Sequence, residues 1–504
     1  MAGVLANTQI DNAEIFEFSA TEIRTKLCQS WIEVQNGLNA DRLFITSKKE
    51  VDNELAQIQD IVDNLHKKSG FVWHVHVFCV QEEAGVEIYA FYKYWEGWQS
   101  LQSVNLSNVH PSPSSNSAMG IATYLWHLDK ALHSRKPSPG ELSELKMLTG
   151  YPSPLVSTYA ADIMTRLGLP VVPALVARLV RHSDDDYRHT RAENSADLMF
   201  EDKIDVCAYN FFEAVHPSYS KQTIVTARFI KQYCLPSGLD LDWECIDVGS
   251  GPGLPLLMLL EMFPHLNATA IEPSKVAYKY LRNNLKLFND SQVKPVCEDF
   301  LKHVEDKLYP LIVSTGASHH FNTHFFFQKA YRLLSKGGVL VVADEFISKY
   351  ESIRERKLNL IKHHSQYMLE ILPNSPLAEK RITDEEHQLM KLFKTLLPKA
   401  AFYAQTDQLS QSEQLCRRLL KDSLALNLGS FISHEQLAFY RLMLLELEAM
   451  VAGLDYQVEQ KTYPERLLQI ASLSGFQLLS HERAHATYGH GEWDAGTHVF
   501  AFSK

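Results

Sequence analysis

The sequence lacks the features of several large classes of protein. Its 504 residues contain no run of eighteen apolar residues, and the first residues are not a basic segment followed by an apolar core. A membrane span needs the first feature and a secretory signal needs the second. Lys and Arg form no block of five or six, and the formal net charge is −11. We therefore expect a cytoplasmic protein with no nucleic-acid or membrane partner.

Cysteine is also scarce. The seven cysteines are odd in number, widely spaced and without a C-x-x-C pair, which argues against a disulfide framework and against a cysteine-based metal motif. We interpret them as reduced intracellular thiols. His74 and His76 share one face of a predicted strand, but no third ligand follows nearby, so we predict no metal site.

The most informative feature that is present is a glycine-rich turn after an apolar strand. Residues 245–253 read CIDVGSGPG, with glycine at positions 249, 251 and 253. Such a turn exposes main-chain N–H groups to a ligand that approaches closely. A dinucleotide fingerprint would place its third glycine at position 254, which is Leu254. The turn therefore predicts a nucleoside-bearing cofactor that is not a dinucleotide.

Two later strands end in acidic residues. The strand predicted over residues 268–271 is followed by Glu272, where a doubly wound sheet places an acid for the ribose hydroxyls. The strand predicted over 293–296 leads into Asp299 and Phe300, an acid and an aromatic ring that suit an adenine. Three strand ends thus predict one adenosine site.

This series of motifs resembles the class I S-adenosylmethionine-dependent methyltransferases. The matching segments are residues 246–253, 271–273, 298–300 and 333–344, and the likeness covers about residues 236–348 and 464–504. It implies an α/β fold with a doubly wound, Rossmann-like, mainly parallel seven-stranded sheet, and S-adenosyl-L-methionine as the cofactor. Pro310 departs from the family, which often has an acid early in its fourth strand. By resemblance, the cofactor site comprises Asp247, Gly249, Ser250, Gly251, Gly253, Glu272, Pro273, Asp299, Phe300, Ser314, Thr315 and Tyr219.

The length of the chain predicts several domains. A helix is expected over residues 50–67 and a β-hairpin over 71–95, while three capping boxes, at Thr383, Ser410 and Ser433, predict helix starts. We divide the chain into an N-terminal α+β domain (1–118), a mostly helical connecting region (119–235), the cofactor-binding core (236–348), a helical insertion or lid (349–463) and the last helix and strands of the core (464–504).

The candidate catalytic residues are histidines. The fourth strand leads into His319 and His320, and imidazole titrates near neutrality, as a proton acceptor should. Adjacent side chains diverge, so one of the two is expected to face the acceptor; the alternative is that they cap the following helix. Residues 485–493 are either a second polar flap or a solvated hairpin.

We predict an enzyme that methylates a small, partly hydrophobic organic acceptor, with oxygen preferred because a histidine base suits a protonated nucleophile. Methyl transfer from a sulfonium requires no metal. The alternatives are a protein methyltransferase and a non-catalytic S-adenosylmethionine-binding scaffold. A homodimer is one possible assembly of this chain.

Overall fold

The structure is a computed structural model, and the chain divides into two compact units, Met1–Ile163 and Met164–Lys504. The structure describes residues 72–82, 85–94, 104–105, 115–169, 171–181, 200–216, 218–234, 244–263, 266–288, 291–371, 383–428 and 437–504.

The first unit contains a three-stranded antiparallel sheet and helices. The strands β1 (Val72–Glu82) and β2 (Gly85–Tyr94) form the predicted hairpin, and β3 (Val104–Asn105) pairs with β2. The helices α4 (Ser115–Leu132) and α5 (Pro139–Leu148) follow, and α6 (Pro154–Arg166) runs across the boundary between the units. The helix predicted over residues 50–67 and the side chains of His74 and His76 lie outside the described part of the chain.

The second unit is built around a seven-stranded sheet in the order β6-β5-β4-β7-β8-β10-β9. Its strands are β4 (Glu244–Val248), β5 (Asn267–Ile271), β6 (Val293–Val296), β7 (Tyr309–Thr315), β8 (Leu334–Phe346), β9 (Gln477–Tyr488) and β10 (Ala495–Ser503).

The expectation of a mainly parallel sheet is wrong, because the sheet is mixed. The strands β6, β5, β4, β7 and β8 pair in parallel, but β10 is antiparallel to both β8 and β9. The cause is the short connection from Tyr488 to Ala495, since a parallel pairing needs a crossover of roughly a dozen residues or more.

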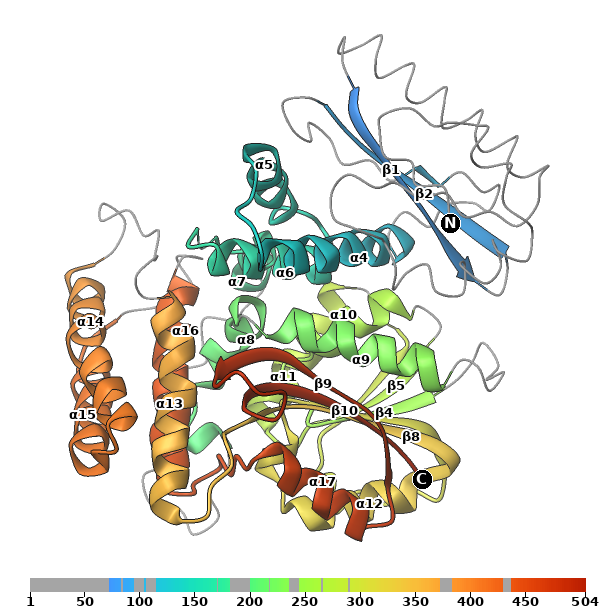
Figure 1. The fold of residues 1–504 in the computed structure, drawn as a ribbon. Coiled ribbons are helices and arrows are strands. Elements are labelled where there is room, and N and C mark those ends of the chain that lie inside the picture. Colours follow the sequence, from blue (N-terminus) through green and yellow to red (C-terminus); the bar gives the residue numbers. More distant parts are fainter. Residues whose placement is uncertain are drawn as a thin grey trace. The chain divides into compact units, whose positions relative to one another are not determined.

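Helices cover both faces of this sheet (Figure 1). On one face lie α9 (Tyr219–Tyr233) and α10 (Leu254–Met262), and on the other lie α12 (Thr323–Leu333) and α17 (Pro464–Leu473). On the side of α12 and α17, a core of Phe326, Phe327, Leu467 and their neighbours packs beneath β4, β7 and β8. The remaining elements before β8 are α7 (Ala174–Arg181), η2 (Phe200–Asp202), α8 (Val206–Val215), α11 (Lys275–Leu287) and η4 (Ser318–His320).

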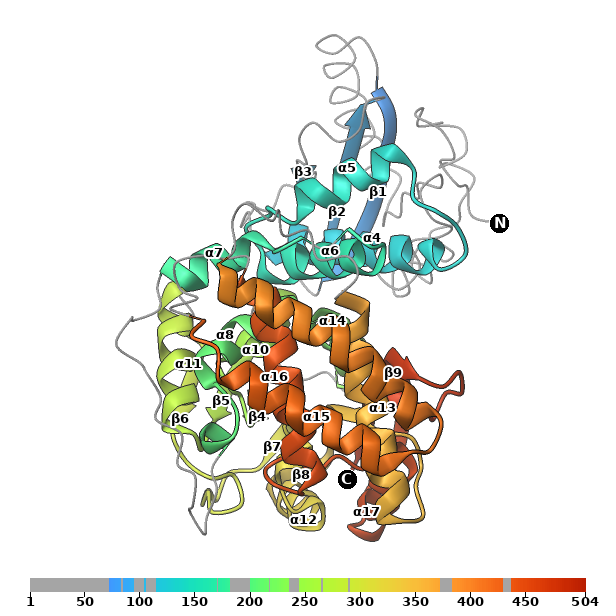
Figure 2. The ribbon, with the colours of Figure 1, turned by 90° about the vertical axis from the view of Figure 1, so that its left-hand side faces the viewer.

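Between β8 and α17 the chain forms α13 (Ile353–Ile371), α14 (Asp384–Gln405), α15 (Leu409–Leu424) and α16 (Leu437–Leu454), which pack together as a helical group (Figure 2). The capping box at Thr383 is confirmed. The one at Ser410 is wrong, because α15 begins at Leu409 after Gln408, and Ser433 lies outside the described residues. Among the described helices, none combines the length and apolar character that crossing a membrane requires.

Candidate active site

A cavity of about 590 Å³ opens at the carboxyl ends of the central strands. The register pairs Val248 of β4 with Ile271 of β5 and Ser314 of β7, and Ile271 with Val296 of β6. The residues that follow these four strands therefore lie along one edge of the sheet. Seven predicted site residues line the cavity: Gly249, Gly251, Glu272, Pro273, Asp299, Thr315 and His320.

The glycine turn leaves room that side chains would fill. Gly249 has φ +68°, and a Cβ added there would lie 2.4 Å from Cβ of Ala317. Gly253 has φ +92°, and its added Cβ would lie 2.4 Å from Cδ1 of Leu281, away from the cavity. Gly249 thus keeps one wall of the cavity open, while Gly253 allows α10 and α11 to pack closely.

Glu272 is held in a fixed orientation. Its Oε2 accepts the N–H of Gly251 at 2.8 Å and its Oε1 accepts the N–H of Ser274 at 2.8 Å. Burial raises the pKa of Glu272 to about 7, although both N–H donors oppose that shift. A carboxylate has about four lone-pair sites, so each oxygen retains acceptor capacity for a ribose hydroxyl.

The predicted adenine end is arranged differently from the expectation. Asp299 lines the cavity and its Oδ1 accepts the N–H of Leu301 at 2.9 Å. Phe300 is fully buried in the core below the sheet and does not line the cavity. Leu301 provides the apolar surface there instead.

Three predicted residues lie behind the cavity wall. The Ser250 hydroxyl donates to the carbonyl of Asp247 at 3.2 Å, and the Ser314 hydroxyl donates to the carbonyl of Val248 at 3.3 Å. Burial raises the pKa of Asp247 to about 6. These side chains support the strand ends from behind.

Glu213 is a cavity residue that the sequence analysis missed. It projects from α8, is 3% exposed, and accepts the N–H of Leu254 at the start of α10 at 3.1 Å. Burial raises its pKa well above the ordinary value, which the N–H of Leu254 only partly opposes. A glutamate in the otherwise apolar segment VCAYNFFEAV was the available signal.

Comparison with known families gives a match over this region. Residues 246–342 match the profile of the family described as "Methyltransferase domain", which spans β4 to β8 and the turn, acids and strand ends described above. This segment of the chain is therefore similar to a methyltransferase domain.

Three solved structures are similar to parts of this chain. One from Methanococcus maripaludis, titled a putative S-adenosyl-L-methionine-dependent methyltransferase, is 24% identical over 30% of this chain and 67% of its own, with a TM-score of 0.25. An S-adenosylmethionine-dependent methyltransferase from Clostridium acetobutylicum is 18% identical over 25% of this chain and 51% of its own, with a TM-score of 0.22. PKMT2 from Rickettsia typhi in complex with AdoHcy is 12% identical over 52% of this chain and 48% of its own, with a TM-score of 0.30. The chain thus spans about half the length of two of these structures, and no curated protein matches it.

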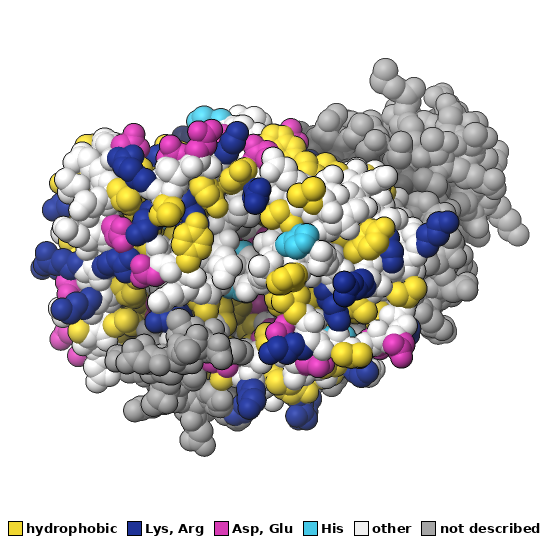
Figure 3. All heavy atoms as spheres, turned by 90° about the horizontal axis from the view of Figure 1, so that it is seen from below, with side chains coloured by type: hydrophobic (Ala, Val, Ile, Leu, Met, Phe, Trp, Pro, Cys, Tyr) yellow, Lys and Arg dark blue, Asp and Glu magenta, His cyan; other side chains and the backbone are white. Residues whose placement is uncertain are grey.

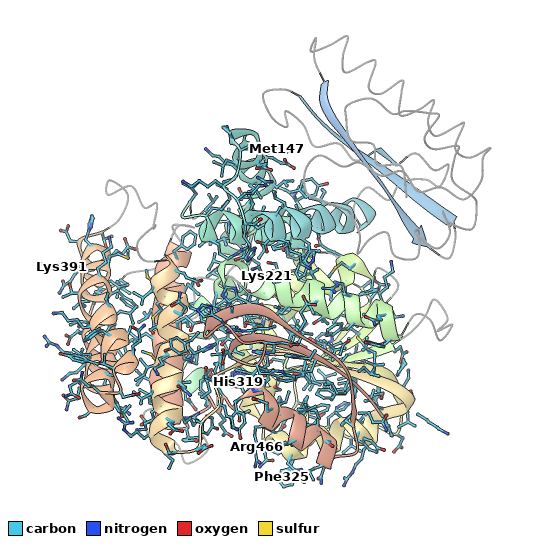
Figure 4. All side chains as sticks on the ribbon, in the orientation of Figure 1. Met147, Lys221, His319, Phe325, Lys391 and Arg466 are labelled. Atoms are coloured by element: carbon cyan, nitrogen blue, oxygen red, sulfur yellow. The ribbon has the colours of Figure 1, made fainter. Side chains whose placement is uncertain are left out.

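The two candidate histidines have different surroundings. Nδ1 of His319 donates to Oδ1 of Asp344 at 2.6 Å, and its Nε2 lies 3.0 Å from Oε2 of Glu459. Although burial lowers it, Asp344 and Glu459 raise the pKa of His319 to about 9. His319 is therefore a buried cation, and Figure 4 shows it in the interior of the unit.

His320 is neutral instead. Its Nδ1 donates to the carbonyl of Val458 at 2.7 Å, which leaves the lone pair on Nε2. Burial, with the charge of His319, lowers the pKa of His320 to about 4. His320 borders the cavity whereas His319 does not.

Val458 belongs to the segment between α16 and α17, which the sequence analysis did not connect with the site. Val458 and Gln460 line the cavity, and Val458 has φ +49°. A β-branched residue rarely adopts this conformation, and such strain is found mostly at functional sites. The helical insertion therefore contributes to the wall next to His320.

Beyond this wall lies a buried cluster of charged residues, which the sequence analysis also missed. The Lys461 ammonium donates to Oε2 of Glu459 at 2.5 Å and lies 3.4 Å from Oε2 of Glu345. We define the buried cluster as His216, His319, Asp344, Glu345, His363, His364, Glu446, Glu459 and Lys461. Tyr219, predicted at the cofactor, borders the small cavity beside this cluster, with its hydroxyl 2.6 Å from that of Tyr209.

Proposed function

We propose that this protein transfers the methyl group of S-adenosylmethionine to an oxygen atom of a small, partly hydrophobic organic acceptor. The observation that carries the proposal is the cavity of about 590 Å³ that joins the glycine turn, Glu272 and Asp299 to the neutral His320 in one space. Its volume suits a cofactor-sized ligand with additional room.

The residues present fit this cofactor. Glu272 would accept the ribose hydroxyls, Asp299 would accept the adenine amino group, and the turn at Gly249 and Gly251 would lie against the methionine part. When bound, S-adenosylmethionine supplies a methyl group that its sulfonium has already activated. The protein's own task is then to orient the acceptor, exclude water and receive a proton.

We assign His320 to receive the proton of the acceptor's hydroxyl group. Its Nε2 carries a free lone pair because Nδ1–H is committed to Val458, and the imidazole is neutral at any pH above about 4. The already protonated His319 supports it from behind. A pKa of about 4 makes His320 a weak base, so we assign it to orient a hydroxyl and to accept its proton only as the oxygen attacks.

A small acceptor is favoured over a macromolecular one. Val458 and Gln460 add a wall to the cavity on the side of the insertion, and a walled cavity suits a small molecule more than a protein segment. The face shown in Figure 3 carries basic and acidic side chains intermixed, without a field of one sign. A polyanionic substrate would favour a basic patch.

The test separates binding from transfer. Calorimetry should show saturable binding of S-adenosylmethionine and S-adenosylhomocysteine, and no binding of NAD. S-adenosylmethionine labelled in its methyl group is then incubated with the protein and either the small-molecule filtrate or the protein fraction of a cell extract. We expect label in the filtrate, and its loss with His320→Ala, which should keep cofactor binding.

Other outcomes would decide against parts of the proposal. Label only in the protein fraction would show a protein methyltransferase. Binding without label in either fraction would favour a scaffold, and absence of cofactor binding would refute the assignment altogether.

A further inference from the structure

A second, smaller cavity lies within the buried cluster. Its volume is about 40 Å³, and it shares Tyr209, Gly316 and His320 with the larger cavity. A space of this size holds a single water molecule or ion. Its wall includes charged and imidazole side chains from β8, α13, α16 and the segment before α17.

Three potential metal ligands lie together beside this cavity: Glu345 and Glu446 line it, and His216 contacts both. Nε2 of His216 lies 3.3 Å from Oε1 of Glu345 and 3.1 Å from Oε1 of Glu446, and the three donor atoms lie within 4.8 Å of one another. Two donors that are each about 2.1 Å from one ion are about 3.0–3.4 Å apart. The two distances from His216 match this spacing, although the one to Glu446 is also that of a hydrogen bond.

Each of the three side chains is also anchored through its other polar atom. Nδ1 of His216 lies 2.9 Å from Oγ of Ser218, and Oε2 of Glu446 accepts from Nδ1 of His364 at 2.6 Å. Oε2 of Glu345 is held by Lys461 at 3.4 Å. Metal ligands characteristically have such partners, which fix the orientation of the donor atoms.

The surroundings contain more negative than fixed positive charge. The buried cluster has four carboxylates, Asp344, Glu345, Glu446 and Glu459. Its cations are the Lys461 ammonium and the protonated His319, so the carboxylates outnumber them. Burying so many carboxylates is costly unless cations accompany them.

A further nitrogen is available at the same place. His364 is 1% exposed and lines the small cavity, and its Nε2 has no hydrogen-bond partner among the described residues. Buried polar atoms are normally satisfied, so this nitrogen is an independent sign that something polar occupies the cavity.

We propose that His216, Glu345 and Glu446 bind one divalent first-row transition ion, whose remaining coordination positions face the small cavity. Imidazole with two carboxylates suits Zn²⁺, Mn²⁺, Fe²⁺ or Co²⁺, whereas Ca²⁺ and Mg²⁺ prefer oxygen ligands alone. Binding places the ion on the lone pair of His216 Nε2 and releases any proton held there. The other possible group, His319, His320 and Glu459, is less suited because the Lys461 ammonium already contacts Glu459.

This proposal does not depend on methyl transfer, because metal content is measured without any cofactor or acceptor. The protein is stripped with a chelator, loaded with Zn²⁺ or Co²⁺, freed of excess ion and analysed by elemental mass spectrometry. We expect a metal-to-chain ratio near unity, and with Co²⁺ a visible absorption band that indicates nitrogen and oxygen ligands.

The variants Glu446→Gln and His216→Gln should each lower metal affinity by at least about tenfold, the loss typical even of weaker changes around metal ligands. The matched control is His481→Gln, which removes a buried histidine of β9 that contacts His498 at 2.9 Å outside the buried cluster. It should retain the metal. Circular dichroism and S-adenosylmethionine binding establish that each variant is folded.

The proposal is overturned if the wild-type protein retains no more metal than the stripped sample, or if Glu446→Gln and His481→Gln retain it equally. A chain that binds S-adenosylmethionine but no metal would refute this site and leave the proposed methyl transfer standing. A chain that binds metal but not S-adenosylmethionine would refute the proposed methyl transfer and leave this metal site standing.

Discussion

The two cavities of the second unit are built in opposite ways. The larger one, about 590 Å³, is shaped by backbone turns at the ends of parallel strands and bordered by partly exposed side chains. The smaller one, about 40 Å³, is surrounded by side chains of the buried cluster, which pair with one another at distances of 2.5–3.5 Å.

From this difference we expect the larger cavity to govern ligand binding and the buried cluster to govern the free energy of unfolding. Substitutions at the larger cavity should weaken ligand binding while most of the fold remains, because its carboxylates, such as Glu272, are held by backbone N–H groups rather than by a charged partner. Substitutions in the buried cluster should lower the free energy of unfolding, since removal of one partner leaves another charge buried and unpaired. Paired substitutions, one from each region, test this separation.

The largest effect is expected for His319→Gln. The change removes a cation that lies between Asp344 and Glu459, so the free energy of unfolding should fall by about 3–5 kcal/mol. Urea unfolding at pH 6 measures it. Because its pKa rises to about 9 in the folded state, this stabilisation is complete below about pH 6.5 and is lost as the pH rises through 9.

The neighbouring His320→Gln is the matched control. His320 is already neutral and its side chain donates one hydrogen bond, to Val458, so the loss should be about 1 kcal/mol. Equal losses for the two variants would contradict the assignment of the charge to His319.

At the larger cavity, Glu272→Ala should weaken binding of S-adenosylmethionine by about 1.5–3 kcal/mol, or roughly ten- to hundredfold in Kd, because it removes a carboxylate acceptor for the ribose. Glu298→Gln is the comparison, since Glu298 lines the same cavity but pairs with His303. It should change Kd by less than about threefold. Calorimetry on both variants decides, and unchanged binding by Glu272→Ala would refute the placement of the ribose.

The glycine turn offers a test of geometry. In Gly249→Ala, the new Cβ would meet Ala317 at 2.4 Å, and neither alanine has a side-chain rotamer that relieves the contact. Gly337 has a similar φ of +76°, but an added Cβ there meets nothing within 4 Å. Gly337→Ala should therefore lose about 1 kcal/mol from the backbone alone, and Gly249→Ala about 1–2 kcal/mol more. Thermal unfolding measures both, and equal losses would show that the turn can shift.

The part of the larger cavity that lies at the strand ends could be predicted from the sequence because its motifs are local. The glycine turn, Glu272 and Asp299 each follow a recognisable strand, and the parallel register brings the strand ends together. Phe300 shows the limit of this reasoning. Consecutive residues point to different sides of the chain, and only the packing showed that Phe300 enters the core while Asp299 and Leu301 line the cavity.

The buried cluster could not be predicted in the same way, because its residues come from six separate segments of the chain. Signals for single members existed. Glu446 stands within the apolar run LAFYRLMLLELEAM of α16, and Glu345 follows the apolar strand segment VLVVA. A charge in such a position needs a buried partner, but the sequence does not identify which partner. The mixed sheet was missed because the sequence does not show that β9 extends to Tyr488, only a short link away from the start of β10 at Ala495.

The smallest predicted effect is a pH dependence, and its sign differs between the two regions. Cofactor affinity at the larger cavity should rise with pH, whereas the stability supplied by the buried cluster should fall. Burial raises the pKa of Glu272 to about 7, and the ionised carboxylate is the better acceptor for ribose hydroxyls. Its ionised fraction rises from about 0.1 at pH 6 to about 0.9 at pH 8, so the affinity for S-adenosylmethionine should increase about ninefold over this range. The stability supplied by His319 falls over the upper part of the same range. Calorimetry at pH 6, 7 and 8 measures the first trend, and Glu272→Gln should remove the contribution of Glu272 while leaving any titration of the cofactor itself. An equally steep pH dependence in Glu272→Gln would assign the effect to another group.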